Sequence, residues 1–398
     1  MILSDFIEKT IDNRGKNPSK YYESEKYPVI DNVLIKNKIY PNLSEVNRYI
    51  DQETFDSFLR GYVHRGMPLM TLVGNGIGNV TLAPSDDVAI IQNTIGFQVK
   101  ENLDEKYLYY YLLSNNERIR NFDRGSGQPS IRKTDILGME VDFPDIDIQK
   151  NISKFLYLLD LKIEQNENIN KNLAEQIHAL TDDMLSNPSS DWAEISLDTI
   201  ATFISGYSYK GKELTDSNIA MATIKNFNRT GGFKLSGYKE IIPSDKLKAT
   251  QHANLFDLLV AHTDLTQNAE VIGNAEMVIS TSGYSDIVFS MDLVKVLPKQ
   301  GISKFLLAAL LQDKRFKAHC LGYVNGTTVL HLSKKALPEY SLLLPSDLSE
   351  LQELDQVITS MYSTIANNIK ENTELTNLRD SLLPRIMSGE IDVSNINI

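Results

Sequence analysis

The stretch that decides the fold is residues 152–184, ISKFLYLLDLKIEQNENINKNLAEQIHALTDDM. Apolar residues and two asparagines recur in it at alternating spacings of four and three, the pattern of a coiled-coil seam. The seam positions are Ile152, Leu156, Leu159, Ile163, Asn166, Asn170, Leu173, Ile177, Leu180 and Met184. The sequence therefore predicts one long helix that buries one side against a partner helix.

A second stretch repeats these phases 202 residues later. Its seam positions are Leu354, Ile358, Met361, Ile365, Asn368, Asn372, Leu375 and Leu382, with Arg379 interrupting. Antiparallel pairing would place Asn166 opposite Asn372 and Asn170 opposite Asn368, because both pairs of residue numbers sum to 538. A buried asparagine costs stability but fixes helix register, so we expect these four residues to set it. The alternative is that each helix packs only on its own domain.

The rest of the chain also matches itself in the same order. Leu3-Ser-Asp-Phe-Ile recurs as Leu197-Asp-Thr-Ile-Ala, and Val29-Ile-Asp-Asn-Val as Thr223-Ile-Lys-Asn-Phe, both at an offset of 194. Further matches pair residues 107–113 with 305–311, 127–131 with 326–330, and 142–144 with 343–345. Five matches in one order predict a divergent tandem duplication.

Each copy combines a mixed module with a helical tail. Residues 1–145 and 187–345 alternate short β-rich runs with Gly, Asn, Asp, Ser and Pro, and each holds one strong helix. Residues 146–186 and 346–398 are the tails. We therefore expect an α+β protein in which two homologous domains are joined by two long helices. The helices would form an antiparallel coiled coil with a pseudo-two-fold axis.

Motifs for catalysis or metal binding are absent from the sequence. There is no His-Glu-x-x-His, Walker loop or Gly-x-Ser-x-Gly, and the one cysteine and six histidines lack metal-ligand spacing. Gly74-Asn-Gly-Ile-Gly78 is followed by strand-like residues, so we interpret it as a tight connection. Pro144-Asp145 with Asp160-Leu-Lys162 is similar to a nuclease motif. We interpret that as coincidence, because Asp160 falls on the predicted solvated side of the helix. We expect no catalytic site and no metal site.

The charge distribution separates the tails from the modules. The whole chain carries a formal charge of −12, which argues at first against a nucleic-acid partner. The two tails contribute −3 and −6, whereas the modules carry −4 and +1. The negative charge therefore belongs mostly to the tails, and the modules remain candidates for binding DNA.

Basic residues gather in Gly-, Ser- and Asn-rich loops of both modules, beside aromatic residues. Such loops supply phosphate contacts and amide groups that read base edges. The alternative for any single cluster is a solvated loop. The candidate DNA-binding residues are Arg14, Lys16, Lys20, Tyr22, Arg124, Ser126, Gln128, Tyr209, Lys210, Lys212, Lys225, Asn226, Arg229, Asn325 and Thr327.

The expected location is the cytoplasm. No apolar run approaches the roughly 18–20 residues of a membrane span, and the opening Met1-Ile-Leu-Ser-Asp does not begin a signal peptide.

Taken in order, these features resemble one known family over nearly the full chain, the specificity (S) subunit of type I restriction-modification systems. The resemblance rests on the segment from Gly127 through Phe143-Pro144 to Gln149, with the helix that starts at Ile152. It rests also on the ending LRDSLLPRIMSGE at residues 378–390. The second copy departs from the family after Pro345, where Ser-Asp-Leu-Ser-Glu replaces the usual proline-to-glutamine phrasing.

The resemblance implies two target-recognition domains, at 1–145 and 187–345, each followed by a conserved helix. It implies that this non-catalytic subunit reads a bipartite, asymmetric site in double-stranded DNA, one domain per half-site. Two methyltransferase subunits would carry the S-adenosylmethionine, motor-nuclease subunits would join for restriction, and this chain itself would hold no cofactor. The alternatives are a DNA-free coiled-coil scaffold and, disfavoured by the missing motifs, a stand-alone DNA-modifying enzyme.

Overall fold

The structure is a computed structural model that describes residues 1–16, 18–299 and 301–392. The chain forms two compact units, Met1–Gln165 with Asn372–Ile398, and Asn166–Glu371. Each unit combines one mixed module with part of both long helices, α5 (Ile146–Ser186) and α9 (Gln352–Met387). From the sequence we expected a different division, in which the two helical tails are segments separate from the two modules. Residues 393–398 of its last segment lie outside the described residues.

The first unit is built on an antiparallel sheet in the order β1-β7-β4-β5, formed by Ile7–Ile11, Thr94–Val99, Pro68–Thr71 and Val80–Leu82. A small sheet, β3-β2-β6, joins Tyr49–Ile50, Tyr27–Ile30 and Ala89–Ile90, and β2 runs parallel to β6. The helices are α1 (Gln52–Phe58), α2 (Glu105–Ser114), α3 (Asn116–Arg120) and α4 (Lys133–Leu137), besides the part of α5 and α9 in this unit. Short 3-10 turns cover Leu3–Asp5 and Leu43–Glu45.

The second unit repeats this plan. Its main sheet, β14-β12-β16-β9, joins Ala275–Met277, Leu258–Ala261, Leu293–Pro298 and Ala201–Ser205. The small sheet β11-β10-β15 joins Lys239–Glu240, Ile219–Ala222 and Asp286–Phe289, again with one parallel pair. Two further sheets join β13 (Thr263–Asp264), β18 (Leu330–Leu332) and β17 (Val324–Asn325), and β19 (Ser341–Leu344) with β8 (Ala193–Ser196). Its module contains helices α6 (Leu197–Ile200), α7 (Lys304–Leu311) and α8 (Lys314–Leu321).

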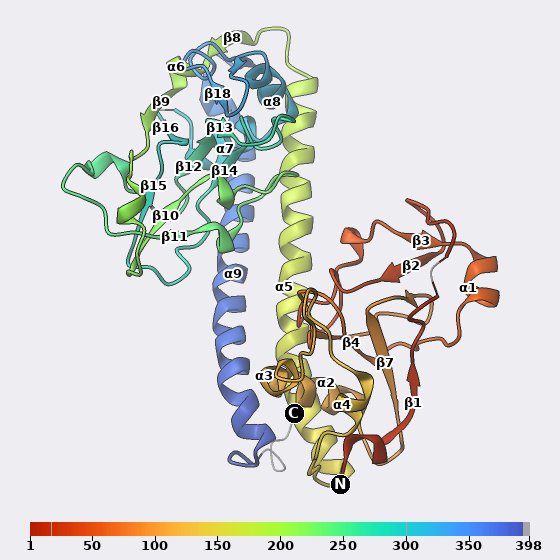
Figure 1. Ribbon diagram of the computed structural model, residues 1–398. Coiled ribbons are helices and arrows are strands. Elements are labelled where there is room, and N and C mark those ends of the chain that lie inside the picture. The colour runs from red at the N-terminus through yellow and green to blue at the C-terminus, as the bar shows by residue number, and fades with distance from the viewer. Residues whose placement is uncertain (17, 300, 393–398) are drawn as a thin grey trace. The chain divides into compact units, whose positions relative to one another are not determined.

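The two sheet orders correspond strand for strand, which confirms the predicted duplication (Figure 1). The buried leucines Leu3 and Leu197 begin equivalent short helices, and their backbone N–H groups donate to Met139 and Tyr340. Two of the sequence matches are displaced by two residues. Strand β2 ends at Ile30 and β10 at Ala222, so the offset there is 192 and not 194.

The second displacement concerns the glycine of a tight loop. A Cβ at Gly125 would lie 1.8 Å from the carbonyl oxygen of Gln128, and one at Gly326 would lie 2.2 Å from that of Val329. Gly326 therefore corresponds to Gly125, and not to Gly127 as the sequence match suggested. The backbone turns so closely at both places that a side chain does not fit.

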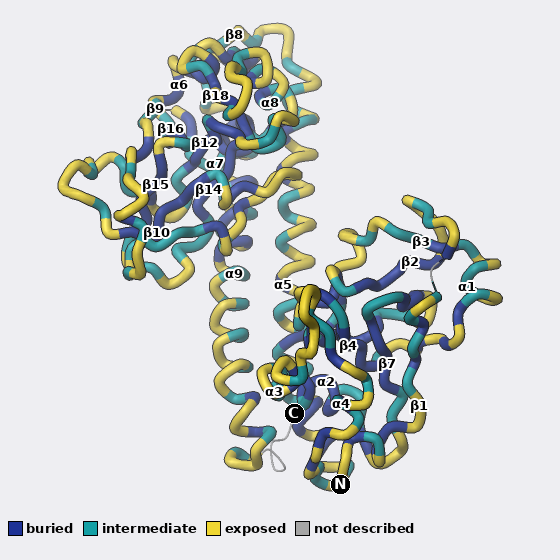
Figure 2. Tube along the Cα trace, in the orientation of Figure 1, coloured by how far each residue is buried: buried dark blue, intermediate teal, exposed yellow. Residues whose placement is uncertain are grey.

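The sheets and α2 or α7 enclose the core of each module, and the long helices contribute to it. In the first unit Ile152, Leu156, Leu383 and Ile386 join the buried cluster that contains α2. In the second unit Ile177, Ile358, Tyr362 and Ile365 join the cluster that contains α7. Figure 2 shows this pattern, with buried sheet strands and exposed loops in both modules. The helices therefore share their modules' cores.

Helices α5 and α9 pair antiparallel within each unit. In the second unit the Asn368 amide donates to the Asn170 oxygen at 2.8 Å, which confirms the predicted Asn170–Asn368 layer. The Asn166 amide donates to Glu371 at 2.6 Å. In the first unit the Asn372 amide donates to the Ile163 carbonyl at 3.2 Å. The predicted seam is buried or half-buried with one exception in α5, since Leu180 is exposed.

The interpretation of Asp160 as a solvated residue is wrong. Asp160 is buried, its carboxylate forms an ion pair with Arg379, and it accepts a 2.6 Å hydrogen bond from the Tyr110 hydroxyl. Arg379, which interrupts the apolar pattern of the second seam, therefore has a partner on the facing helix. The motif similarity reflects a buried structural contact between α2, α5 and α9.

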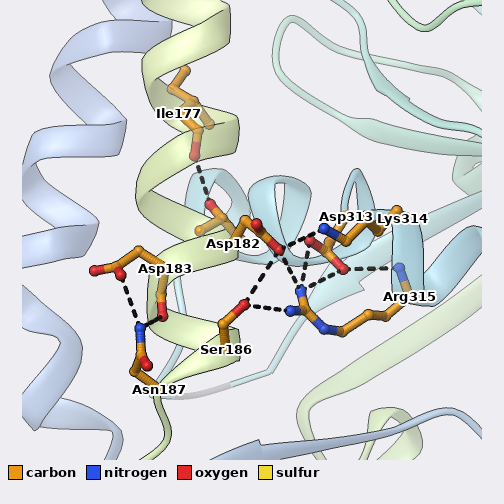
Figure 3. Close-up of polar contacts among 9 residues, drawn as sticks. Ile177, Asp182, Asp183, Ser186, Asn187, Asp313, Lys314 and Arg315 are labelled. Carbon is orange, nitrogen blue, oxygen red and sulfur yellow. Dashed lines mark hydrogen bonds and ion pairs between the residues drawn. The ribbon is translucent and has the colours of Figure 1, made fainter.

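Each module is also tied to α5 by polar contacts. In the first unit the buried Gln149 accepts from the Asp104 N–H at 2.9 Å and donates to the Pro144 carbonyl at 2.8 Å. In the second unit Asp182 binds Arg315 at 2.9 Å and Lys314 at 3.1 Å (Figure 3). The hydrogen bond from Lys314 and the contact with Arg315 lower the pKa of Asp182. These contacts fix where each module sits on its own segment of helix.

No helix within the described ranges combines the length and the hydropathy that crossing a membrane requires.

Candidate nucleic-acid interface

The first group of predicted residues lies in the loop that follows β1. Arg14 is held by Asp12 through two hydrogen bonds of 2.9 and 2.7 Å. The Lys16 ammonium lies 5.0 Å from the ring centre of Phe58, and that of Lys20 lies 4.2 Å from the ring centre of Tyr22. The aromatic side chains of Phe58 and Tyr22 therefore position two of the cations.

The Tyr22 hydroxyl donates to Asp51 at 2.9 Å, and Asp51 also caps α1 by accepting from the Thr54 N–H. Hydrogen bonds from the Thr54 hydroxyl, the Thr54 N–H and the Tyr22 hydroxyl, in that order of size, lower the pKa of Asp51. Tyr22 is half-buried, so it supports the loop and presents only part of its ring.

A second loop of the first unit, residues 123–130, carries Arg124, Ser126 and Gln128, all exposed. Asp123 closes it by accepting from the N–H groups of Gly125 at 2.9 Å and Ser130 at 2.8 Å. Arg124 binds Asp135 of α4 at 2.9 Å. The hydroxyl of Ser126 and the amide of Gln128 are thus held at the tip of a closed loop. Groups of this type read base edges.

In the second unit two predicted cations, Lys225 and Arg229, come together with a third, Lys234. They line one open pocket of about 500 Å³, with Asn228, Thr230 and Thr266. One carboxylate, Asp264, also lines it. Asp264 is buried and accepts hydrogen bonds from the backbone of Val271 and Thr266, which hold its pKa below the usual value despite the opposing effect of burial. The cations are exposed, and Arg229 also lies 3.1 Å from Glu270.

The structure corrects one member of the predicted set, Asn226, which is not available to contact DNA. It is fully buried, its amide oxygen accepts from the Thr223 N–H at 2.9 Å, and its amide nitrogen donates to the Lys234 carbonyl at 3.0 Å. The side chain therefore shapes the loop that bears Lys225 and Lys234, and it does not face a ligand. From the sequence, an asparagine that caps a turn looks the same as one that contacts a base.

The segment 209–212 lies elsewhere in the second module. Tyr209 is half-buried against a small apolar cluster, and Lys210 and Lys212 are exposed. Glu213, which is itself buried, accepts from the Lys210 N–H at 2.8 Å and from the Tyr207 hydroxyl. This turn presents two cations on a backbone that the carboxylate of Glu213 keeps in place.

Asn325 and Thr327 lie in the loop equivalent to residues 124–130. Both are exposed, and the Gln267 amide donates to the Thr327 carbonyl at 2.6 Å. Gln267 follows Thr266, a lining residue of the pocket that contains Lys225. The structure thus links two predicted loops of the second module through residues 264–267.

Besides Lys234, three exposed residues beside these groups were not in the predicted set. Lys9 and Arg60 line a pocket with Arg14 and Lys133. Leu265 is 67% exposed and lines the pocket with Lys225. Lys9 lies in a strand and Arg60 just before the buried Gly61, so neither belongs to a local run of basic residues. Clusters of charge along the sequence do not reveal contacts between distant segments.

Another pocket of the second unit, about 550 Å³, contains the carboxyl of Glu276. Apolar residues such as Phe233 and Tyr362 line it together with polar ones such as Lys171 and Gln312. Glu276 accepts from the Gly232 N–H at 2.6 Å, and burial raises its pKa to about 7. Within residues 1–16, 18–299 and 301–392, no group of three or more His, Cys, Asp or Glu side chains could hold a metal ion.

Comparison with known proteins finds matches over the whole chain. Residues 1–175 match the family described as type I restriction modification DNA specificity domain. The type I restriction enzyme MjaVIII specificity subunit of Methanocaldococcus jannaschii is 21% identical over 422 residues, which cover 99% of this chain and 93% of that protein. The MjaIX specificity subunit of the same organism is 21% identical over 425 residues, covering 96% and 91%.

A solved structure shares the fold. The type I restriction-modification system S subunit from M. genitalium superposes with a TM-score of 0.59 at 16% identity, covering 97% of this chain and 95% of that one. The arrangement of mixed modules and long helices is therefore one that a natural protein adopts.

Proposed function

We propose, from the premise that this chain belongs to the family of type I restriction-modification specificity subunits, that it selects the DNA sequence on which such a complex acts. Each module would read one half of a bipartite, asymmetric site in double-stranded DNA. The chain itself would be non-catalytic. Two methyltransferase subunits would bind it and bring S-adenosylmethionine, and motor-nuclease subunits would join for restriction.

The observation that carries this proposal is the repeated topology with divergent loops. The two main sheets have the same strand order, and the tight loops at Gly125 and Gly326 are equivalent. The residues that these loops expose differ, with Ser126 and Gln128 in one and Asn325 and Thr327 in the other. Two equal frameworks that present different polar groups can read two different short sequences.

The helices support the second part of the proposal. Helices α5 and α9 each extend from one unit into the other, and their pairing is defined by buried contacts in both units. We propose that their length sets the unread gap between the half-sites. The acidic tails leave the positive charge in the module loops, where phosphate contacts are needed.

The test is reconstitution of this chain with the methyltransferase subunits of a type I restriction-modification system. The complex with S-adenosylmethionine should methylate adenines in a duplex that contains the site, and the purified chain alone should not. Methylation by the chain alone would instead support a stand-alone enzyme. A complex that forms without salt-dependent DNA binding would support a DNA-free scaffold.

A further inference from the structure

A basic pocket lies in the first unit beside the predicted recognition loops. We call it the basic pocket and define it by Lys9, Arg14, Arg60 and Lys133. Its volume is about 490 Å³, and Asp12, Thr10, Ile11 and Gly61 complete the lining. Four cations therefore share a small open space with a single carboxylate.

That carboxylate, Asp12, already has two cationic partners. Asp12 accepts two hydrogen bonds from the Arg14 guanidinium, at 2.9 and 2.7 Å, and lies 3.6 Å from the Lys133 ammonium. The side-chain hydrogen bond from Arg14 is the largest of the influences that hold the pKa of Asp12 below its usual value. Within the described ranges, no carboxylate lies within ion-pair distance of Lys9 or Arg60. The pocket keeps an excess of positive charge.

The walls are fixed by buried polar contacts. Asn13 is fully buried, accepts from the N–H groups of Arg60 at 2.9 Å and Gly61 at 3.2 Å, and donates to the carbonyls of Gly61 and Ile90. The Arg60 guanidinium donates to the Arg14 carbonyl at 3.2 Å. Two segments about 46 residues apart are thereby held together with their cations on one pocket.

The fold does not require the charges of Lys9 and Arg14, although Lys133 has a lysine counterpart, Lys334. Strands β1 and β9 are equivalent, and Ile11 pairs with Gly96 of β7 as Ile204 pairs with Lys295 of β16, so Lys9 corresponds to Thr202 and Arg14 to Tyr207. The second module builds the same sheet without cations at these positions. Gathering like charges is unfavourable unless an anion neutralises them, so a ligand is the simplest reason for their presence.

We propose that the basic pocket binds a phosphate of the DNA backbone next to the half-site read by the first module. The proposal rests on the proposed function and adds where the backbone is held. Arg14 begins one predicted loop, and Lys133 follows the loop that carries Ser126 and Gln128. A phosphate bound between them would set the register of the duplex against those base-reading groups, without contributing sequence information itself.

The experiment measures the salt dependence of DNA binding by the complex of this chain with its methyltransferase subunits. The probes are a duplex that contains the methylated site and one with a scrambled sequence. Arg60→Gln and Lys133→Gln should each reduce the slope of log K against log salt by about 1. Both should weaken binding to the two duplexes by the same factor.

Two further variants make the result specific. Lys133→Arg keeps the charge and should keep the wild-type slope. Lys36→Gln removes an exposed cation of the same unit that is paired with Glu45, and its slope should equal the wild type's. Wild-type slopes for Arg60→Gln and Lys133→Gln would overturn the phosphate site while leaving the proposed function intact. A wild-type complex that does not distinguish the two duplexes would overturn the proposed function itself.

Discussion

Arg379 of α9 and Asp160 of α5 form an ion pair inside the first unit, with side chains only 14% and 4% exposed. The repeat offset of 202 relates Asp160 to Tyr362 and Arg379 to Ile177. These two counterparts belong to the apolar core of the second unit. One pairing of the helices thus contains a buried charge pair where the other contains apolar contacts. Any swapped pairing of equivalent helices would bury a charge against an apolar residue, which is strongly unfavourable.

Arg379→Met should therefore destabilise the first unit by about 3–5 kcal/mol, because it leaves the Asp160 carboxylate buried without its cation. The double variant Asp160→Leu/Arg379→Met should lose much less than the two single variants together. Arg385→Met is the matched control, since Arg385 pairs with Glu390 at an exposed position and such pairs contribute under about 1 kcal/mol. Chemical denaturation measures the free energy of unfolding of each variant. Hydrogen exchange in α2 and α9 shows where the stability is lost. Equal losses for Arg379→Met and Arg385→Met would rule out a structural role for the pair.

Gly125→Ala and Gly326→Ala should each disturb one recognition loop. A Cβ would lie 1.8 Å from the Gln128 oxygen in the first loop and 2.2 Å from the Val329 oxygen in the second, so the backbone must move. Gly125→Ala should relax base preference in one half-site only, and Gly326→Ala in the other. Gly127→Ala is the control, because a Cβ there meets no atom within 4 Å. Selection of sites from a randomised duplex pool reads the outcome, and loss of both half-sites in either variant would contradict it.

Glu276→Gln tests the buried carboxyl of the second unit. The folded pKa of about 7 lies above the ordinary value of 4.5, so the folded state holds a proton that the unfolded state releases. Wild-type stability should therefore fall as pH rises from about 4.5 to 7, and the variant should escape that loss. The free energy of unfolding of Glu276→Gln should therefore exceed that of the wild type by an amount that grows to about 3 kcal/mol at pH 7.

The measurement for Glu276→Gln is denaturation at pH 5 and pH 7.5, with hydrogen exchange in β14 to locate the change. Glu194→Gln, which alters an exposed glutamate of the same unit, provides the comparison. A difference between Glu276→Gln and wild type that stays constant with pH would show that Glu276 is ionised throughout.

Lengthening both helices should widen the recognised gap. Seven residues inserted after Gln165 and seven after Glu371 add one heptad to each helix, or about 10 Å. That distance corresponds to roughly three base pairs at 3.4 Å each. Both insertions are needed, because one alone shifts the facing seam residues out of register. The methylated motif should keep its two half-sites and gain about three unread positions, and an unchanged gap would refute the role of the helices as a spacer.

Much of the fold could be predicted from the sequence because its signals are periodic. The four-and-three spacing defines α5 and α9, and the constant sum of residue numbers gives the Asn170–Asn368 contact. The burial of Asp160 could not be predicted in this way. Tyr110 of α2 covers its place on the helix surface, and periodicity along one helix does not reveal such a contact. The displaced matches at Ile30 and Gly125 have a similar cause, since loop lengths changed between the copies.

The candidate interface was predictable only in part. Lys225, Arg229 and Lys234 are close in sequence and gather around one pocket. Lys9 and Arg60 meet Arg14 only through the fold, and Asn226 turned inward to hold the backbone. Composition identifies loops that can bind DNA, whereas tertiary contacts decide which of their side chains face it.

The most direct test of the central claim is methylome sequencing of a methylation-free host that carries this chain with its methyltransferase subunit. We expect adenine methylation in one motif made of two different short sequences separated by a fixed number of unread bases. Gly125→Ala and Gly326→Ala should each degrade a different half of that motif. A continuous motif, or methylation that does not depend on this chain, would contradict the proposed bipartite recognition.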